Sequence, residues 1–392
     1  MDIQTISAIV FIVAMTVFLI VMRKKVVLQK IFFPLLYLIL YRSKFGLRFM
    51  KNFPARHPNI VKWFGHIGVV VGFIGMVFIS INLVMVFSTM ITTPDAPSGV
   101  APVLPVPVRG AIYVPFFYWI ISIFVIATVH EFAHGIVANH YKIPIKSSGF
   151  AFFGLVLPII PAAFVEPNEN VLKRKSAWKQ LSVFAAGPFS NIVLAFIVLG
   201  VIVAVMNPLS ALAFANDGVM IDSVFVNSSA AEYGISSGEI IMSVDGVDIF
   251  TVDDFTRSLQ NLSSGSYLYI TTNSSSYNVV LGEHPENSDR GFLGVTVSQH
   301  VAENQDFIDR YGIVALEVVR WISGLFFWLF LLNLGIGLFN LVPLGIVDGG
   351  MMLQIALLGV FKGRKELAHK IWKFVSLGFL FLILFMLIMS FL

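Results

Sequence analysis

Long apolar runs separated by short polar segments dominate this chain. Each run is long enough to cross about 30 Å of hydrocarbon, which takes about 20 helical residues. We therefore predict a polytopic α-helical membrane protein with about six transmembrane helices. The predicted spans are residues 5–22, 66–90, 113–138, 177–206, 314–342 and 371–391.

Composition supports a multi-pass membrane protein. Hydrophobic residues make up 57% of the 392 positions and charged residues only 12%, against about a quarter in soluble domains. The net charge of +4 does not indicate a nucleic-acid partner, because the basic residues lie in short loops where they act as topology signals. The chain has no cysteine, so any metal must be held by histidines and carboxylates.

The distribution of basic residues predicts which side of the membrane each loop occupies. Residues 23–62 contain ten lysines or arginines, which places them in the cytoplasm by the positive-inside rule. Alternation then puts 91–112 outside, 140–176 inside and 207–312 outside, and the charges of these loops agree. The basic loop that begins at Lys362 returns to the cytoplasm.

Two further apolar stretches do not fit the count of spans. Residues 150–165 are too few to cross and are interrupted by Pro158 and Pro161, so we expect them to enter the membrane and return on the same side. Non-helical backbone at membrane depth is tolerated only inside protein or beside a wet cavity, so a dip of this kind indicates a site. The second stretch, 344–361, follows a predicted helix end at Pro343.

A polar insert lies between the fourth and fifth spans. Residues 215–297 are Ser-rich and alternate as short strands do, and 251–262 reads as a helix with Thr251 at its N-cap. We therefore predict one inserted soluble domain of mixed α and β structure on the outer side.

The third span carries the candidate chemistry, in the stretch His130-Glu131-Phe132-Ala133-His134. Positions i and i+4 of a helix share a face, so both imidazoles can reach one ion while Glu131 contacts an activated water. An ionisable group at this depth is costly and needs a partner. The pattern favours a metal-dependent hydrolase over a structural His–Glu pair.

A catalytic zinc ion normally takes three protein ligands, so one more is needed. Asp348 is the only acidic residue between Glu317 and Glu366, and we select it as the third ligand. His140 is the nearest rival, but it lies off the i, i+4 face and close to the cytoplasmic boundary. Glu317 and Arg320, at i, i+3 spacing, are interpreted as an interfacial ion pair.

Three motifs in order carry a family resemblance. HEFAH in one span, AAGPFSN with Asn191 in the next, and NLVPLGIVDGG with Asn340 and Asp348 resemble the site-2 protease family of intramembrane zinc metalloproteases. This resemblance implies one catalytic Zn²⁺ held by His130, His134 and Asp348, with Glu131 as the base. It further implies that Asn340 donates to the substrate or the developing oxyanion and that Asn191 contacts the substrate.

The same resemblance implies that 150–165 form a membrane re-entrant β-hairpin that offers an edge strand to an unwound transmembrane protein substrate. The insert resembles a PDZ domain, with Gly218, Val219, Met220 and Ile221 as the loop that receives a peptide or substrate terminus. The active site is expected near the cytoplasmic side of a cell membrane and the PDZ-like domain outside, so that cleavage releases a cytoplasmic regulatory fragment.

Two readings from other classes stay open: a metal transporter, and a scaffold that binds transmembrane segments without cutting them. A transporter would need polar groups along several spans, whereas this sequence shows one compact cluster in the lipid bilayer. The predicted organisation is an N-terminal membrane region (1–112), the first part of the catalytic core (113–206), the PDZ-like domain (207–300), the second part of the core (301–361) and a basic loop with the C-terminal span (362–392).

Overall fold

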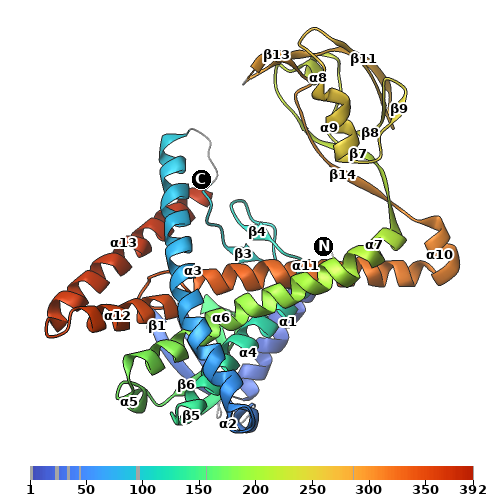
Figure 1. Cartoon of the computed structure of the whole chain (residues 1–392). Helices are drawn as coiled ribbons and strands as arrows, with labels where there is room; N and C mark the ends of the chain where they lie inside the picture. The colour runs from blue at the N-terminus through green and yellow to red at the C-terminus, as the bar shows by residue number, and fades with distance from the viewer. Residues whose placement is uncertain are drawn as a thin grey trace. The chain divides into compact units, whose positions relative to one another are not determined.

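The computed structural model describes residues 3–22, 26–32, 36–43, 46–93, 98–155, 157–285 and 287–391. It contains two compact units (Figure 1). We call Met1–Ile202 with Gly324–Leu392 the membrane unit, and Val203–Ser323 the inserted unit. Each is described by itself, and the predicted domain boundaries stay predictions.

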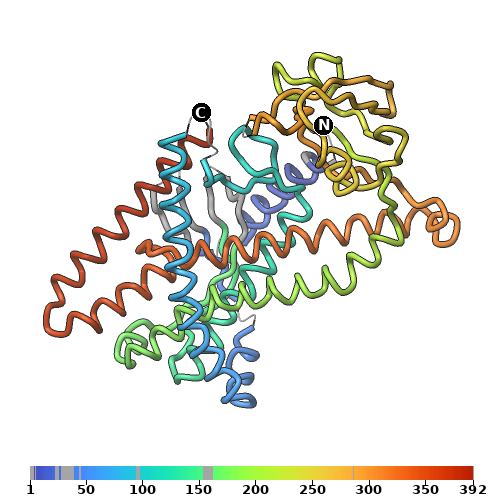
Figure 2. Tube along the Cα trace, turned by 45° about the horizontal axis from the view of Figure 1, so that its top comes forward, coloured from blue at the N-terminus to red at the C-terminus, as the bar shows by residue number. Residues whose placement is uncertain are grey.

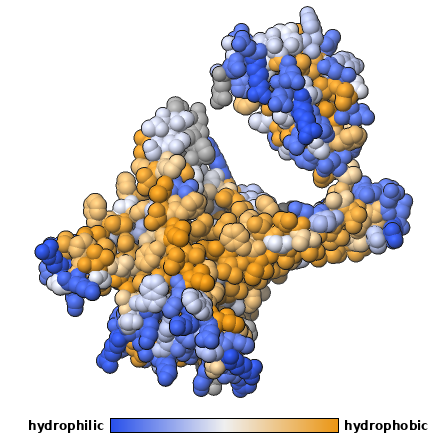
Figure 3. Space-filling view, viewed as in Figure 1, coloured by the Kyte–Doolittle hydropathy of each residue, from blue (hydrophilic) through white to orange (hydrophobic). Residues whose placement is uncertain are grey.

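Long apolar helices make up most of the membrane unit, and apolar side chains cover much of its visible face (Figure 3). Within the described ranges, five helices are long and apolar enough to cross a membrane. The predicted first span corresponds to α1 (Ile3–Val21), whose apolar stretch Ile6–Val21 is shorter, so the sixth crossing stays a prediction. The five are α3 (Pro58–Thr92), α4 (Phe116–His140), Ala177–Ala213, α11 (Ile313–Phe339) and α13 (Lys365–Phe391).

Small residues let these helices approach closely. Gly65, Gly68 and Gly72 of α3 lie against side chains of α6 (Ala177–Val201), and Gly72 also faces Met352 of α12 (Asp348–Val360). Near Gly337, α11 contacts Asn191 of α6, and the course of both helices can be followed in the Cα trace (Figure 2). Because lipid offers no hydrophobic drive between helices, close contacts of this kind hold the bundle together.

A four-stranded antiparallel sheet adjoins α4, in the order β1-β2-β5-β6. The predicted dip falls within a hairpin formed by β5 (Ile145–Leu155) and β6 (Leu157–Pro167), although residue 156 lies outside the described residues. The depth of this hairpin in the membrane stays a prediction. β1 (Val26–Phe32) and β2 (Leu36–Ser43) lie in the segment expected to be a basic loop, and β2 pairs with β5.

Short elements connect the parts of the membrane unit. Helix α2 (Leu47–Arg56) packs against α4, and α5 (Glu169–Leu172) precedes α6. The predicted stretch 344–361 forms a turn followed by α12. A small parallel pair, β3 (Val103–Leu104) and β4 (Ile112–Tyr113), precedes α4.

The inserted unit has the predicted mixed α and β structure. Its main sheet has the order β11-β10-β8-β7-β14, with β9 paired to β8. Thr251 caps α9 (Val252–Gln260) in a reciprocal arrangement with Asp254, which confirms the predicted N-cap. The strands are β7 (Phe214–Val224), β8 (Ile240–Val244), β9 (Val247–Asp248), β10 (Tyr267–Thr272), β11 (Ser276–Val280), β12 (Gly282–His284), β13 (Asn287–Phe292) and β14 (Val295–Glu303). The remaining helices are the π-helix Ile202–Met206, α7 (Asn207–Ala213), α8 (Ser229–Glu232) and α10 (Gln305–Tyr311).

The predicted peptide-terminus loop is not a loop. Gly218, Val219, Met220 and Ile221 lie within β7, where Val219 pairs with Gln299 of β14 on one side and with Ile241 of β8 on the other. The polar, Gly-containing sequence suggested a turn, but the strand passes through it with a shift in its pairing to β14, and Gly218 takes a positive φ of 96° at this irregularity. The predicted binding role of these residues stays a prediction.

Candidate metal centre and active site

Two histidines of α4 and one aspartate of α12 converge in the membrane unit. His130 Nε2 lies 3.1 Å from His134 Nε2 and 3.1 Å from Asp348 Oδ2, and His134 Nε2 lies 3.4 Å from the same Asp348 oxygen. Both histidines are buried. In the part of the chain that the structure describes, these three residues form the only such group able to hold a metal ion.

The spacing of these atoms fits a tetrahedral zinc site. With metal–ligand distances of about 2.0–2.2 Å, neighbouring ligand atoms of a tetrahedron lie about 3.4 Å apart. The separations of 3.1–3.4 Å match this edge length. Two imidazoles and one carboxylate leave a fourth position open, as catalytic zinc sites do.

A turn between α11 and α12 presents Asp348 to the histidines. The Gly349 N–H donates to Asn340 O at 2.7 Å, which closes the turn. From α13, Trp372 Nε1 donates to Gly350 O at 2.8 Å, and Ser376 Oγ donates to Pro343 O at 3.2 Å. The C-terminal helix thus braces the aspartate-bearing turn, a role that no motif in its sequence indicated.

Each histidine is also held through its second ring nitrogen. His134 Nδ1 lies 2.7 Å from Val183 O, so this nitrogen carries the proton and Nε2 is left for a metal. His130 Nδ1 lies 3.1 Å from Asn191 Nδ2, while Asn191 Oδ1 is buried without a partner. Rotating the Asn191 side-chain amide by half a revolution exchanges the positions of its oxygen and nitrogen. In that orientation Oδ1 accepts from the Nδ1–H of His130, which leaves His130 Nε2 without a proton and available to a metal.

Gly187 of α6 leaves room for the two imidazoles. A Cβ at this position would lie 2.6 Å from His130 Nε2 and closer still to His134 Nε2. No side chain fits between α6 and the ring nitrogens. The glycine of the AAGPFSN motif is therefore explained by the space that the candidate ligands occupy.

Glu131 faces the edge strand of the sheet. Its Oε2 accepts a hydrogen bond of 2.8 Å from the Val165 N–H of β6. Successive N–H groups along a strand point alternately to its two sides. The N–H of Asn168, which directly follows β6, points towards β5 and donates to Pro144 O. The odd-numbered N–H groups of β6 therefore point away from β5. Pro161 and Pro167 have no N–H to offer along this edge. The outward N–H groups of this edge are thus those of Ala163 and Val165, and the second already donates to Glu131.

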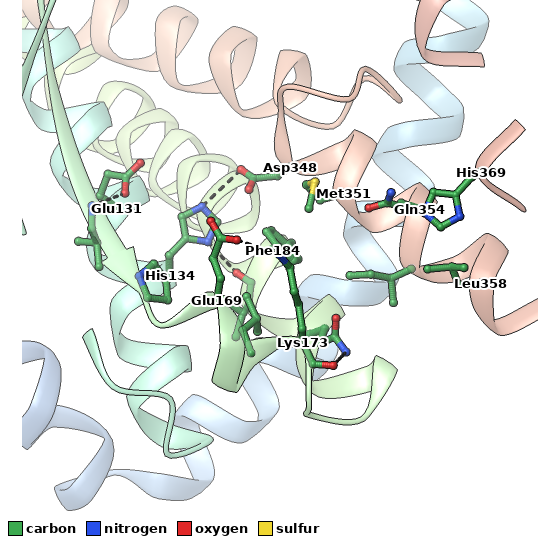
Figure 4. A pocket seen from close by; sticks show the side chains of 16 residues that line it. Glu131, His134, Glu169, Lys173, Phe184, Asp348, Met351, Gln354, Leu358 and His369 are labelled. Atoms are coloured by element: carbon green, nitrogen blue, oxygen red, sulfur yellow. Dashed lines mark hydrogen bonds and ion pairs between the residues drawn. The ribbon is translucent and has the colours of Figure 1, made fainter. Parts of the chain in front are cut away.

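A pocket of about 760 Å³ opens onto this centre (Figure 4). Glu131, His134 and Asp348 line its inner part, and the labelled Met351, Gln354 and Leu358 extend along α12 away from them. The remaining wall comes from β6, α5, α6 and α13, and it includes Val165, Pro167, Glu169, Lys173, Gln180, Phe184 and His369.

Several predicted residues lie outside this pocket. The Asn340 amide donates to Ile336 O of its own helix at 3.0 Å, and its side chain does not line the pocket, which does not favour the predicted oxyanion contact. Asn191 is fully buried behind His130, so its location does not favour direct contact with substrate either. His140 lies at the end of α4, outside the cluster. In the inserted unit, Arg320 pairs with Glu317 at 2.9 Å and also with Glu303. The predicted ion pair is confirmed, and its place at the membrane interface stays a prediction.

These features define a polytopic membrane protein with an HExxH-based metal-ligand cluster. A family model described as Peptidase family M50 matches residues 118–385, and the chain belongs to this family, which includes the site-2 proteases. The match spans the cluster and all three motifs.

Individual relatives are more distant. An uncharacterized protein of Methanocaldococcus jannaschii is 26% identical over 60% of this chain and 56% of its own length. The membrane metalloprotease ARASP, chloroplastic, of Arabidopsis thaliana is 23% identical over 56% of this chain and 59% of its own. A candidate zinc metalloprotease of Agrobacterium fabrum is 22% identical over 55% and 70%. The chain thus spans little more than half the length of the first two.

Among solved structures, the PDZ domain of an SdrC-like protein from Listeria monocytogenes aligns with 19% identity and a TM-score of 0.19. It covers 23% of this chain and 92% of that domain. The PDZ-like character of the inserted unit stays a prediction.

Proposed function

We propose that this protein is an intramembrane zinc metalloprotease that hydrolyses peptide bonds within or near transmembrane segments of membrane-protein substrates. The observation that carries this proposal is the cluster of His130, His134 and Asp348, set beside Glu131 and an edge strand. The two histidines and the aspartate would hold one Zn²⁺. The bound ion supplies Lewis-acid chemistry, polarising the scissile carbonyl and making water a better nucleophile.

Glu131 acts as the base in this proposal. Its carboxylate takes a proton from the attacking water and passes it to the leaving amine, so it must be positioned but not bound to the metal. The hydrogen bond from Val165 fixes one carboxylate oxygen towards β6. Asn191 and Asn340 are assigned positioning roles, the first behind His130 and the second in the turn before Asp348.

The free edge of β6 is the proposed docking strand for the substrate. A transmembrane helix hides its peptide carbonyls in its own hydrogen bonds, so it must unwind before attack. The Ala163 N–H and the neighbouring outward carbonyls can pair with about two or three residues of an extended segment. Docking there brings the segment to Glu131, because Val165 of the same edge already contacts that carboxylate.

We further propose that cleavage occurs near the cytoplasmic side and releases a cytoplasmic regulatory fragment, while the inserted unit lies outside and receives a peptide or substrate terminus. The basic loops support this orientation. A metal transporter is not favoured, since a single metal-ligand group occurs within the described ranges. A non-cutting scaffold is not favoured, because the ligands and the base lie together.

Co-expression of Glu131→Gln with a single-span substrate tests the proposal. The variant should keep one zinc per chain, because all three ligands remain, but should not cleave. Glu366→Gln, an exposed change at the start of α13, is the matched control and should cleave normally. Cleavage by Glu131→Gln at the wild-type rate would refute the assigned base, and zinc-free wild-type protein that still cleaves would refute the metal mechanism.

A further inference from the structure

Two adjoining cavities lie on a part of α4 that faces away from the metal-ligand cluster. The first, which we call the basic pocket, has a volume of about 590 Å³ and is lined by Arg48, Asn52, Arg56 and His57, with Gly46 and aromatic rings. Arg48, Asn52 and Arg56 recur every four residues of α2, so they share one face of that helix. The basic pocket therefore presents two guanidinium groups and an imidazole together.

The second cavity, which we call the apolar groove, has a volume of about 340 Å³ and is lined almost entirely by hydrocarbon. Phe49, Phe53 and Phe132 line both cavities, so the groove continues from the basic pocket. Phe49 lies 5.4 Å from Phe53 and 6.3 Å from Phe132 between ring centroids. The rest of the groove comes from α3, α4 and α6, including Ile60, Phe64, Val129, Ile136 and Ser190.

The charges of this site are unbalanced. Among the residues that the structure describes, no carboxylate lines either cavity. Among the described residues, neither Arg48 nor Arg56 has an ion-pair partner, whereas Arg42 pairs with Glu166 at 3.6 Å. Unpaired guanidinium groups beside an apolar groove are complementary to a ligand that is anionic at one end and hydrocarbon at the other.

Helix α2 has the character of an interfacial helix. Its arginines and Lys51 are exposed, its Met50 and Pro54 are buried, and Phe49 remains 51% exposed. Helices with a charged face and an aromatic face lie at the headgroup boundary of a bilayer. A helix placed in this way would hold its guanidinium groups at the level of lipid phosphates and the adjoining groove at the level of acyl chains.

We propose that the two cavities bind one anionic phospholipid, with its phosphate between Arg48, Arg56 and His57 and an acyl chain in the apolar groove. The lipid would contact Phe132, which lies between Glu131 and His134 in sequence, and so would support α4 behind the metal-ligand cluster. The inference does not depend on hydrolysis.

Lipid binding to the purified full chain tests the headgroup site. Phosphatidylglycerol and phosphatidylcholine with identical acyl chains are titrated in detergent and counted by native mass spectrometry. We expect phosphatidylglycerol to bind more tightly, and Arg48→Gln and Arg56→Gln each to weaken it about 5-fold. The control, Lys51→Gln, removes an exposed charge from the same helix outside the basic pocket and should have no effect. Equal binding of both lipids, or equal losses in all three variants, would overturn the proposal.

Filling the groove tests the acyl-chain site. Ile60→Trp should displace the lipid, whereas Ile67→Trp, an exposed change on the same helix outside the groove, should not. Unchanged zinc content in both variants shows that the membrane unit is folded. Glycerol phosphate should not displace phosphatidylglycerol at the same concentration. Displacement by this soluble headgroup, or retention of lipid by Ile60→Trp, would show that the groove holds no acyl chain.

Discussion

Replacing Gly187 with alanine should remove the metal while leaving the fold intact. The new Cβ would lie 2.6 Å from His130 Nε2 and nearer to His134 Nε2, whereas non-bonded heavy atoms normally stay about 3.5 Å apart. Both rings must therefore retreat by about 1 Å. They cannot pivot freely, because Val183 and Asn191 hold their outer nitrogens. Metal–ligand distances tolerate only about 0.2 Å, so we expect zinc affinity to fall about 100-fold or more.

The assay is zinc content by mass spectrometry of the purified protein, followed by competition with a chelator of known affinity. Gly200→Ala is the matched control, since it lies on the same helix with nothing within 4 Å of its added Cβ. Alanine favours a helix over glycine by about 1 kcal/mol, so weaker helix formation cannot explain a loss of zinc. Wild-type affinity in Gly187→Ala would show that these imidazole nitrogens do not hold the metal.

Three further outcomes are expected. Asn191→Leu should lower zinc affinity about 10- to 100-fold, and Asn191→Asp should restore much of it; equal losses in both would refute the hydrogen-bond role. Trp372→Phe removes the bond to Gly350 and should speed zinc release, measured by chelator-driven dissociation, whereas unchanged release would show that α13 does not brace the turn. In the inserted unit, burial raises the pKa of Glu239, but hydrogen bonds from Thr272 and Tyr277 outweigh it and hold this pKa below its ordinary value. Ionised Glu239 therefore stabilises the folded inserted unit above pH 4.5, and this stabilisation is lost as the pH falls below that value. Below pH 4.5, amide hydrogen exchange in β8 and β10 should become faster in the wild type but not in Glu239→Gln.

The metal-ligand cluster could be predicted from sequence because its chemistry has few alternatives. HEFAH places two imidazoles on one helical face, and without cysteine only a carboxylate or another histidine could complete the set. Asp348 stood alone among apolar residues, which singled it out. The partners that orient the ligands were not visible, since Val183 contributes a backbone carbonyl and Trp372 an indole N–H, and neither leaves a pattern in sequence.

The four-stranded sheet was half predicted. The prolines and flanking charges of 150–165 indicated a non-helical return, which the structure forms as β5 and β6. β1 and β2 were missed because their segment carries loop-like charges, and because β2 pairs with β5 over 100 residues later, at Leu36 and Leu155 for example. Pairing at such distance is set by tertiary contacts and not by local alternation.

The sequence distance between His134 and Asp348 sets when the metal centre can assemble. Asp348 follows 214 residues later, and at roughly 5–20 residues per second its synthesis takes about 10–40 s longer. The brace from Trp372 adds the C-terminal helix to the parts that must be in place. A newly made chain therefore holds Glu131 and two histidines without a third ligand for tens of seconds. A metal centre built in this way cannot form before Asp348 has been synthesised and has reached the two histidines.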